Sequence, residues 1–140
     1  MTLEVHIVTP EREVWAGEAD TVIARGIDGE VGILAGHAPM MVQLAIGPLR
    51  ILRDGEPELG AVVDGGFMHV TSADEHGTRV DVLAAQAELF ADIDAEAARA
   101  RAASLEEQLA QNRDSDLAEA DVERIRSELE KAIARVTLAG

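Results

Sequence analysis

Short runs of apolar residues, several of them alternating with polar ones, fill the first part of the chain. Residues 3–8 (LEVHIV) and 79–83 (RVDVL) alternate, and further β-branched runs lie at 21–24, 31–34, 41–46, 49–52, 59–63 and 67–71. Turn signals separate them at Gly17, Asp28-Gly29, Gly36-His37, Gly47-Pro48, Asp54-Gly55 and Gly65-Gly66. This spacing predicts a small antiparallel β-sandwich or barrel. Strands this short, with polar faces, argue against a parallel sheet.

The chain changes character near residue 84. Eleven of the twelve glycines lie between Gly17 and Gly77, all four prolines precede this point, and no breaker follows before Gly140. Two apolar stripes with heptad-like spacing follow, at Ala98, Ala102, Leu105 and Leu109, and then at Ala118, Val122, Ile125, Leu129, Ala132 and Val136. They predict an antiparallel helical hairpin joined by a polar link at 111–115. Asp92 or Asp94 is expected to cap the first helix, and residue 114, 115 or 116 the second.

The expected fold class is therefore α+β and mainly β, with a sandwich at 1–86 and a two-helix hairpin at 87–140. Half of the first apolar stripe is alanine, and each alanine buries little surface at about 0.8 kcal/mol per CH₂. Such a hairpin should dock only weakly on the sandwich, which suits a movable element. The alternative, that it simply caps the sandwich, stays open on these grounds.

Composition narrows the classes of function. The chain has 140 residues, 47% of them hydrophobic, but its only aromatic residues are Trp15, Phe67 and Phe90, so the core must be aliphatic. A formal net charge of −15 disfavours binding to nucleic acid or to anionic lipid and favours basic protein partners. There is no cysteine, no apolar run of about 20 residues and no signal-peptide pattern at the start. Membrane association is expected only through a partner.

A search for chemistry finds no catalytic pattern. His6, His37, His69 and His76 have neither H-x-H nor H-E-x-x-H spacing, and no serine stands in G-x-S-x-G. Residues 26–32 are glycine-rich but lack the Lys-Ser/Thr of a phosphate loop, and they are typical of a hairpin with Asp28-Gly29 at its tip. Carboxylates are abundant, yet none is isolated in an apolar segment. We expect no catalytic residue, no metal site and a function exerted by contact.

Three segments resemble one family. Residues 29–40 (GEVGILAGHAPM) are similar to the G-E-x-G-I-x-P-G-H-A-P-L stretch of the epsilon subunits of bacterial F-type ATP synthases. Residues 64–70 (DGGFMHV) and 80–88 (VDVLAAQAE) resemble that family's S-G-G-x-x-E-V and V-T-V-L-A-D-x-A-E segments, in the same order. Ala35 stands where the family usually has proline, and His69 where it usually has glutamate.

The resemblance implies a non-catalytic rotor subunit: a sandwich of about ten strands that binds the gamma subunit and the c-ring, followed by a movable hairpin. In this family the hairpin can extend toward the alpha and beta subunits and inhibit ATP hydrolysis. The interface residues it implies are Glu30, Gly36, His37 and Pro39. The regulatory hairpin residues it implies are Leu105, Leu109, Val122, Arg124, Ile125, Arg126, Leu129, Lys131 and Arg135. The expected location is the cytoplasmic face of the bacterial plasma membrane, as part of the complex.

Some members of this family bind ATP between hairpin and sandwich through an I/L-D-x-x-R-A motif. Ile93 and Asp94 match it, but Ala97 replaces the arginine, and Ser104 replaces a second arginine. Glu88, Lys131 and Arg135 fit the remaining positions. Because an arginine that binds phosphate in a bidentate way is missing, only weak ATP binding is expected. An ATP-sensing module is thus the alternative function, and a β-sandwich hydrolase or metal-dependent enzyme is a more distant one.

Overall fold

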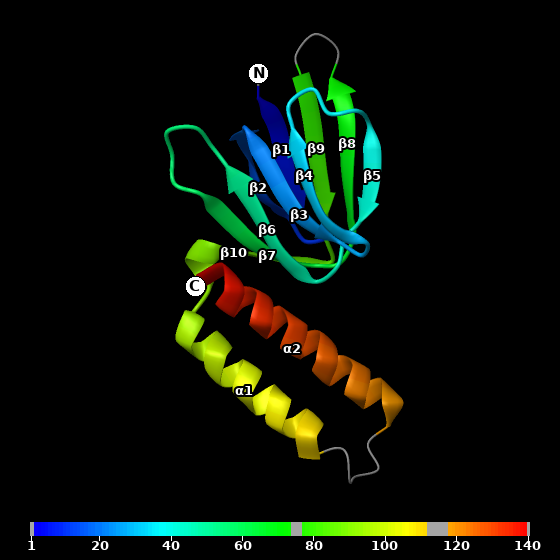
Figure 1. Cartoon of the computed structure of the whole chain (residues 1–140), viewed down its shortest axis with the longest axis vertical. Helices are drawn as coiled ribbons and strands as arrows, with labels where there is room; N and C mark the ends of the chain where they lie inside the picture. Colours follow the sequence, from blue (N-terminus) through cyan, green and yellow to red (C-terminus); the bar gives the residue numbers. More distant parts are fainter. Residues whose placement is uncertain (1, 74–76, 112–117, 140) are drawn as a thin grey trace.

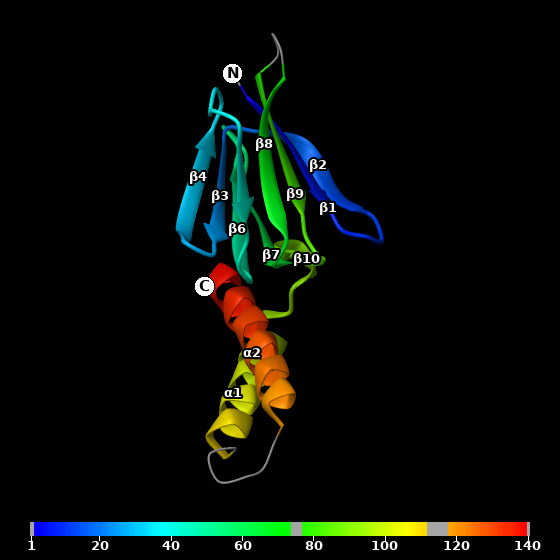
Figure 2. The same ribbon diagram turned by 90° about the vertical axis from the view of Figure 1, so that its right-hand side faces the viewer.

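Two five-stranded sheets face one another and a pair of helices projects from one end of them, in a computed structural model that describes residues 2–73, 77–111 and 118–139 (Figures 1 and 2). The strands are β1 (Leu3–Val8), β2 (Glu13–Ala19), β3 (Thr21–Gly26), β4 (Gly29–Leu34), β5 (Met40–Gln43), β6 (Gly47–Leu52), β7 (Leu59–Asp64), β8 (Phe67–Ala73), β9 (Gly77–Leu83) and β10 (Gln86–Leu89). A short 3₁₀ turn η2 (Phe90–Asp92) leads to helices α1 (Ala95–Gln111) and α2 (Glu119–Ala139). The predicted mainly-β sandwich with a C-terminal helical pair is confirmed.

The two sheets have the orders β2-β1-β9-β8-β5 and β10-β7-β6-β3-β4. Neighbouring strands are antiparallel, with one exception: β1 and β9 run parallel, with Val5 opposite Val80. The sheets are thus antiparallel as predicted, apart from this one pair. A parallel pair needs a long connection, and here the connection is most of the sandwich itself.

The pattern of apolar residues did not predict two of the strands, β2 and β10. Gly17, expected to mark a turn, lies inside β2, opposite Val5. The Trp15 side chain lies over Gly17 so closely that a Cβ there would sit 2.7 Å from the indole ring, so this glycine makes room for an aromatic side chain. The other missed strand, β10, pairs with β7 and places residues 86–89 in the sheet. The division into a sandwich at 1–86 and a hairpin at 87–140 stays a prediction.

The core between the sheets is aliphatic, as the composition predicted. On β1 the inward side chains of Leu3, Val5 and Ile7 are fully buried, and they alternate with outward polar positions. The rest of this cluster comes from the inward positions of the other strands: Ala19, Val22, Ala24, Ile33, Leu44, Leu49, Ile51, Ala61, Val63, Met68, Val70, Val80, Val82 and Ala84. Period-two burial of this kind fixes the register of each strand, since a slip of one residue would expose the whole apolar set.

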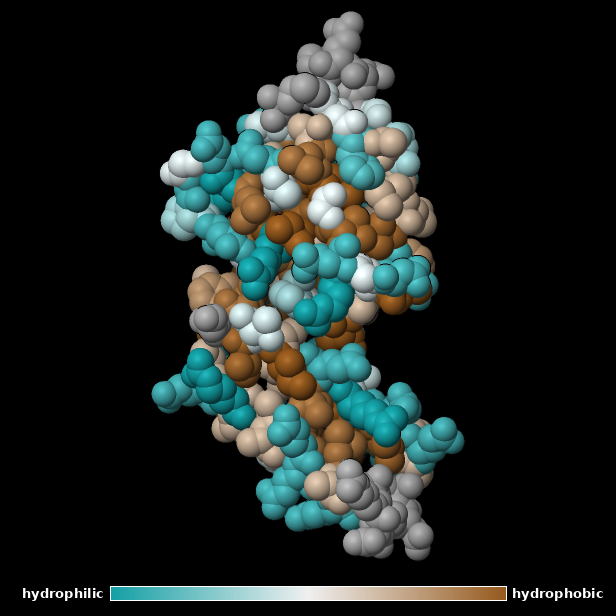
Figure 3. All heavy atoms as spheres, in the orientation of Figure 1, coloured by the Kyte–Doolittle hydropathy of each residue, from teal (hydrophilic) through white to brown (hydrophobic). Residues whose placement is uncertain are grey.

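The helices pack on each other through the predicted stripe. Leu105, Ile125 and Ala132 are buried at its centre, and Ala102, Leu109 and Leu129 are partly buried beside them. Figure 3 shows this apolar seam running between two charged helix surfaces. Ala118, predicted to begin the second stripe, is exposed and lies just before α2.

Asp94 rather than Asp92 caps α1, because its carboxylate accepts a hydrogen bond from the backbone N–H of Ala97 at 3.0 Å. The candidate caps of the second helix, residues 114–116, lie outside the described residues.

Candidate functional site: the junction between hairpin and sandwich

The hairpin meets the sandwich through a second face of α2, distinct from its seam with α1. Lys131 forms an ion pair with Asp64 of β7 at 3.1 Å and donates a hydrogen bond to Gln86 of β10 at 3.3 Å. It also pairs with Glu128 of its own helix at 3.2 Å. Burial acts to lower the pKa of Lys131, but the hydrogen bonds with Asp64 and Glu128 outweigh it, and the pKa is raised. Lys131 is therefore a firmly charged contact between helix and sheet.

One helical turn later, Arg135 reaches Glu88 of β10. Its Nε and Nη2 atoms donate to the same carboxylate oxygen at 3.2 and 2.9 Å. A small cavity of about 240 Å³ lies beside these groups, lined by Val62, Asp64, Gln86, Ala87, Glu88, Lys131 and Arg135. Both cations facing this cavity are thus already engaged by carboxylates.

A close apolar contact ends the junction. Gly60 of β7 is buried, and a Cβ built there would lie 2.6 Å from a methyl carbon of Leu138. The missing side chain lets the last turns of α2 lie on the sheet. Ala134, also buried, lies on the helix between these contacts. The spacing 131, 134, 135 and 138 is a helical face that the sequence analysis had not separated from the seam with α1.

Of the predicted ATP-site residues, the structure brings together Glu88, Lys131 and Arg135. Ile93 and Asp94 do not line their cavity: Ile93 ends the 3₁₀ turn and Asp94 caps α1. Ala97 and Ser104 are exposed on α1. The two predicted basic residues Arg124 and Arg126 are exposed on α2 and pair with Asp121 and Glu123 of the same helix.

The residues predicted for the stalk interface are split between two places. Glu30 lies at the start of β4, whereas Gly36, His37 and Pro39 follow the end of that strand. The backbone N–H of Gly36 donates to the Thr78 hydroxyl at 2.7 Å, which ties this second group to β9. The predicted interface residues thus lie at opposite ends of one edge strand.

The outer face of the sheet β2-β1-β9-β8-β5 carries apolar side chains that nothing in the described chain covers. Phe67 and Leu83 are 45% and 51% exposed and are direct cross-strand partners. Met41, 62% exposed, lies on the neighbouring strand β5, whose Gln43 is opposite Phe67. We call Met41, Phe67 and Leu83 the apolar rim.

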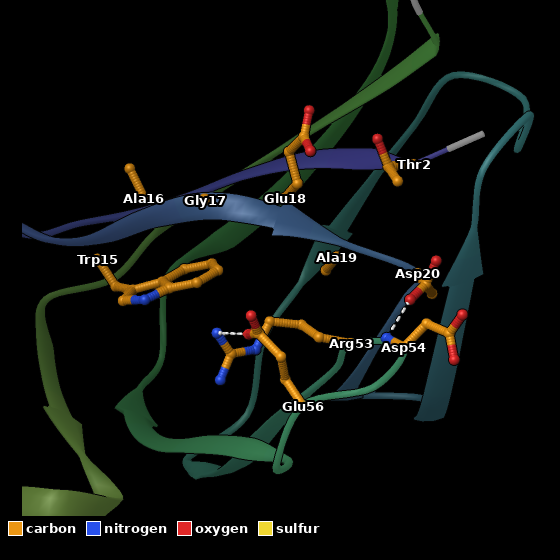
Figure 4. A pocket seen from close by; sticks show the side chains of 10 residues that line it. All are labelled: Thr2, Trp15, Ala16, Gly17, Glu18, Ala19, Asp20, Arg53, Asp54 and Glu56. Carbon is orange, nitrogen blue, oxygen red and sulfur yellow. Dashed lines mark hydrogen bonds and ion pairs between the residues drawn. The ribbon is translucent and has the colours of Figure 1, made fainter.

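A larger hollow of about 610 Å³ lies between β2 and the β6–β7 loop (Figure 4). Its wall is the Trp15 ring, and Arg53 extends into it, paired with Glu56 at 2.6 Å. The Asp20 carboxylate accepts a hydrogen bond from the backbone of Asp54. No local sequence pattern predicts this hollow, because its lining residues come from separate strands and a loop.

Within residues 2–73, 77–111 and 118–139, no group of three or more His, Asp or Glu side chains is arranged to hold a metal ion. Neither described helix is long and apolar enough to cross a membrane.

Comparison with known proteins settles the family. Residues 2–90 match the family model described as "ATP synthase, Delta/Epsilon chain, beta-sandwich domain". The ATP synthase epsilon chain of Desulforamulus reducens is 41% identical over 138 residues, which cover 99% of this chain and 97% of that relative.

The chain belongs to the ATP synthase epsilon chain family.

Other epsilon chains agree. That of Thermobifida fusca is 51% identical over 106 residues, covering 74% of each chain. A solved chain from the mitochondrial ATP synthase of Euglena gracilis, a structure comprising OSCP, F1 and c-ring, superposes with a TM-score of 0.78 at 26% identity. It covers 99% of this chain and 82% of that one. The predictions of the family and of an accessory, non-catalytic chain of ATP synthase are confirmed.

The Gly60 contact gives a prediction about this epsilon chain. In Gly60→Leu the new side chain would occupy the place of Leu138, so the end of α2 should leave the sheet at a cost of about 2 kcal/mol. Hydrogen exchange of residues 131–138 should then speed up roughly tenfold or more, while that of the sandwich stays slow.

Gly32→Leu is the matched control, because Gly32 lies on the outer face of the same sheet with nothing within 4 Å of a Cβ. Equal acceleration in both variants would mean that sheet damage, and not loss of the helix contact, is being measured.

Proposed function

We propose that this chain is a rotor and regulatory subunit of a bacterial F-type ATP synthase. It links the catalytic head to the c-ring during proton-driven ATP synthesis, with its sandwich bound to the gamma subunit. Its hairpin limits ATP hydrolysis by leaving the sandwich and reaching the alpha and beta subunits. The chain is thereby held at the cytoplasmic face of the plasma membrane. Family membership and likeness to a chain from an F1/c-ring assembly support this assignment.

The observation that carries the regulatory part is the small junction. The hairpin touches the sandwich through the C-terminal part of α2, whereas its own seam runs between the two helices. Two ion pairs, one hydrogen bond and one leucine contact are a modest set, since partly exposed ion pairs contribute about 0–1 kcal/mol each. Such a junction can open without unfolding either part.

The apolar rim is the surface that best fits the gamma subunit. It is an exposed apolar set on three neighbouring strands of one sheet, β5, β8 and β9, and the chain that carries it has a net charge of −15. Exposed apolar side chains bounded by charge are typical of protein interfaces. A partner with a basic, apolar surface would complement it.

Leu83→Asp tests this surface. Burying an unpaired carboxylate at the rim should weaken binding to the isolated gamma subunit by about 2 kcal/mol, or roughly thirtyfold. Ile133→Asp is the control, because Ile133 is 44% exposed but lies on α2. If calorimetry shows that both variants bind the gamma subunit as tightly as the parent chain does, the gamma contact lies elsewhere on the chain.

Inhibition would require α2 to exchange its contact with α1 for one with the head. Residues 88–140 contain 13 Asp and Glu against 7 Lys and Arg, a net charge of −6. Arg124 and Arg126 are exposed on α2, while Lys131 and Arg135 would be released from Asp64 and Glu88. We therefore propose weak to moderate inhibition that fades as salt screens these charges.

Truncation after residue 90 should raise ATP hydrolysis by the complete enzyme severalfold at low ionic strength, and less at high. Replacing Arg124 and Arg126 with alanine should give part of the increase, whereas replacing Arg99 and Arg101 on α1 should not. Unchanged hydrolysis by an intact, truncated complex would leave the chain as a coupling piece without an inhibitory role.

ATP binding at the junction is proposed to be weak. Ala97 and Ser104 offer no guanidinium, and the nucleotide would compete with Asp64 and Glu88 for Lys131 and Arg135. The acids beside the cavity would also repel its phosphates.

Calorimetry should thus give a dissociation constant in the millimolar range, about −4 kcal/mol at 1 mM. Ala97→Arg should tighten binding, whereas Ala103→Arg, at another exposed position of α1, should not. A micromolar constant for the parent chain would contradict this assignment.

A further inference from the structure

His6 sits on the outer face of β1 with both ring nitrogens against carboxylates. Its Nε2 lies 2.9 Å from Glu4 Oε1 and its Nδ1 lies 3.2 Å from Glu13 Oε2. Ionised carboxylates only accept hydrogen bonds, so both contacts are satisfied together only when both ring nitrogens carry protons. The geometry is that of an imidazolium bridging β1 and β2.

The other strands add to this environment. On β9, Asp81 lies directly opposite His6, and Arg79 holds Asp81 through Nε at 3.0–3.1 Å while lying 3.7 Å from Glu4. On β8, His69 lies opposite Asp81 and completes the row. Three carboxylates thus outnumber one guanidinium around the ring, so a positive charge on His6 is favourable there.

These contacts raise the pKa of His6 and lower that of Glu4. Hydrogen bonds to Glu4 and then to Glu13 raise the pKa of His6, against the opposing effects of burial and Arg79. The hydrogen bond from His6 lowers the pKa of Glu4. Because the His6 pKa is raised on folding, its contribution to stability is complete below the ordinary histidine pKa and is lost as pH rises through the raised value.

This bridge is adjacent to the apolar rim. Val8, two residues after His6 on the same side of β1, pairs with Leu83. A partner that covers the rim and extends four residues back along β1 from Val8, roughly 13 Å, would remove water from Glu4 and Glu13 as well. Two desolvated carboxylates facing a neutral ring would then lack a donor, which is costly, whereas the protonated ring satisfies both.

We propose that His6 is a proton-binding site through which docking of the stalk partner on this face takes up a proton, so that assembly is tighter at lower pH. This inference rests on the proposed gamma contact at the rim.

Calorimetric titration of the full chain with the gamma subunit tests it. Paired buffers of low and high ionisation enthalpy, at about pH 6 and about pH 8, report the protons bound on docking. We expect little uptake at the lower pH and up to about one proton at the higher pH, with affinity falling as pH rises.

His6→Gln should abolish the uptake and flatten the pH dependence of affinity, while His69→Gln on the same face should keep both. Histidine ring signals of the parent chain, followed by NMR, should show His6 titrating above the ordinary histidine range without relying on any variant folding. Binding without His6-dependent uptake, or a His6 ring titrating at or below the ordinary range, overturns the coupling alone. Absence of gamma binding at every pH, or binding insensitive to Leu83→Asp, overturns the proposed contact and the coupling with it.

Discussion

The burial of aliphatic side chains between two sheets is the constraint on which the rest of this molecule depends. Leu3, Val5 and Ile7 on one sheet, and residues such as Ile33 and Ile51 on the other, are withdrawn from water without an aromatic ring among the fully buried residues of the cluster. This burial sets the register of the strands, and the register in turn decides which residues lie on the outer faces of the sheets. The apolar rim, His6 and the Gly60 surface on which α2 packs are all formed by outward residues whose neighbours along the strand point inward.

The two helices are held together, and held to the sheet, by fewer apolar contacts than the sandwich has. Its seam has three buried side chains, one of them an alanine, and its attachment to the sheet relies on charge pairs and on the space left by Gly60. The sandwich buries far more apolar surface, and the free energy of burial scales with that surface. The placement of leucine, valine and isoleucine therefore gives the sandwich a large apolar core and the helical pair a much smaller one.

Much of this architecture could be predicted from the sequence, and the exceptions have physical causes. Alternation located the eight strands whose outward residues are polar or whose ends carry glycine turns. It missed β2, because Gly17 resembles a turn but serves the Trp15 ring, and β10, because four residues are too few for a periodic signal. The seam of the hairpin followed from heptad spacing, whereas the face of α2 on the sheet mixes Lys131, Ala134, Arg135 and Leu138 and has no hydropathy signal. The parallel pairing of β1 with β9 is a tertiary fact that no local pattern contains.

The parallel pairing of β1 with β9 also determines when the chain can complete its fold during synthesis. Leu3 pairs with Thr78, so one side of the first strand has no partner until nearly the whole sandwich has left the ribosome. The hairpin of β1 and β2 can form early, but the sheet closes only when β9 arrives, a contact between distant residues that slows folding. Until then an aliphatic strand has an open edge, a species prone to aggregation. The acidic residues along that strand and its neighbour would keep nascent copies apart during this interval.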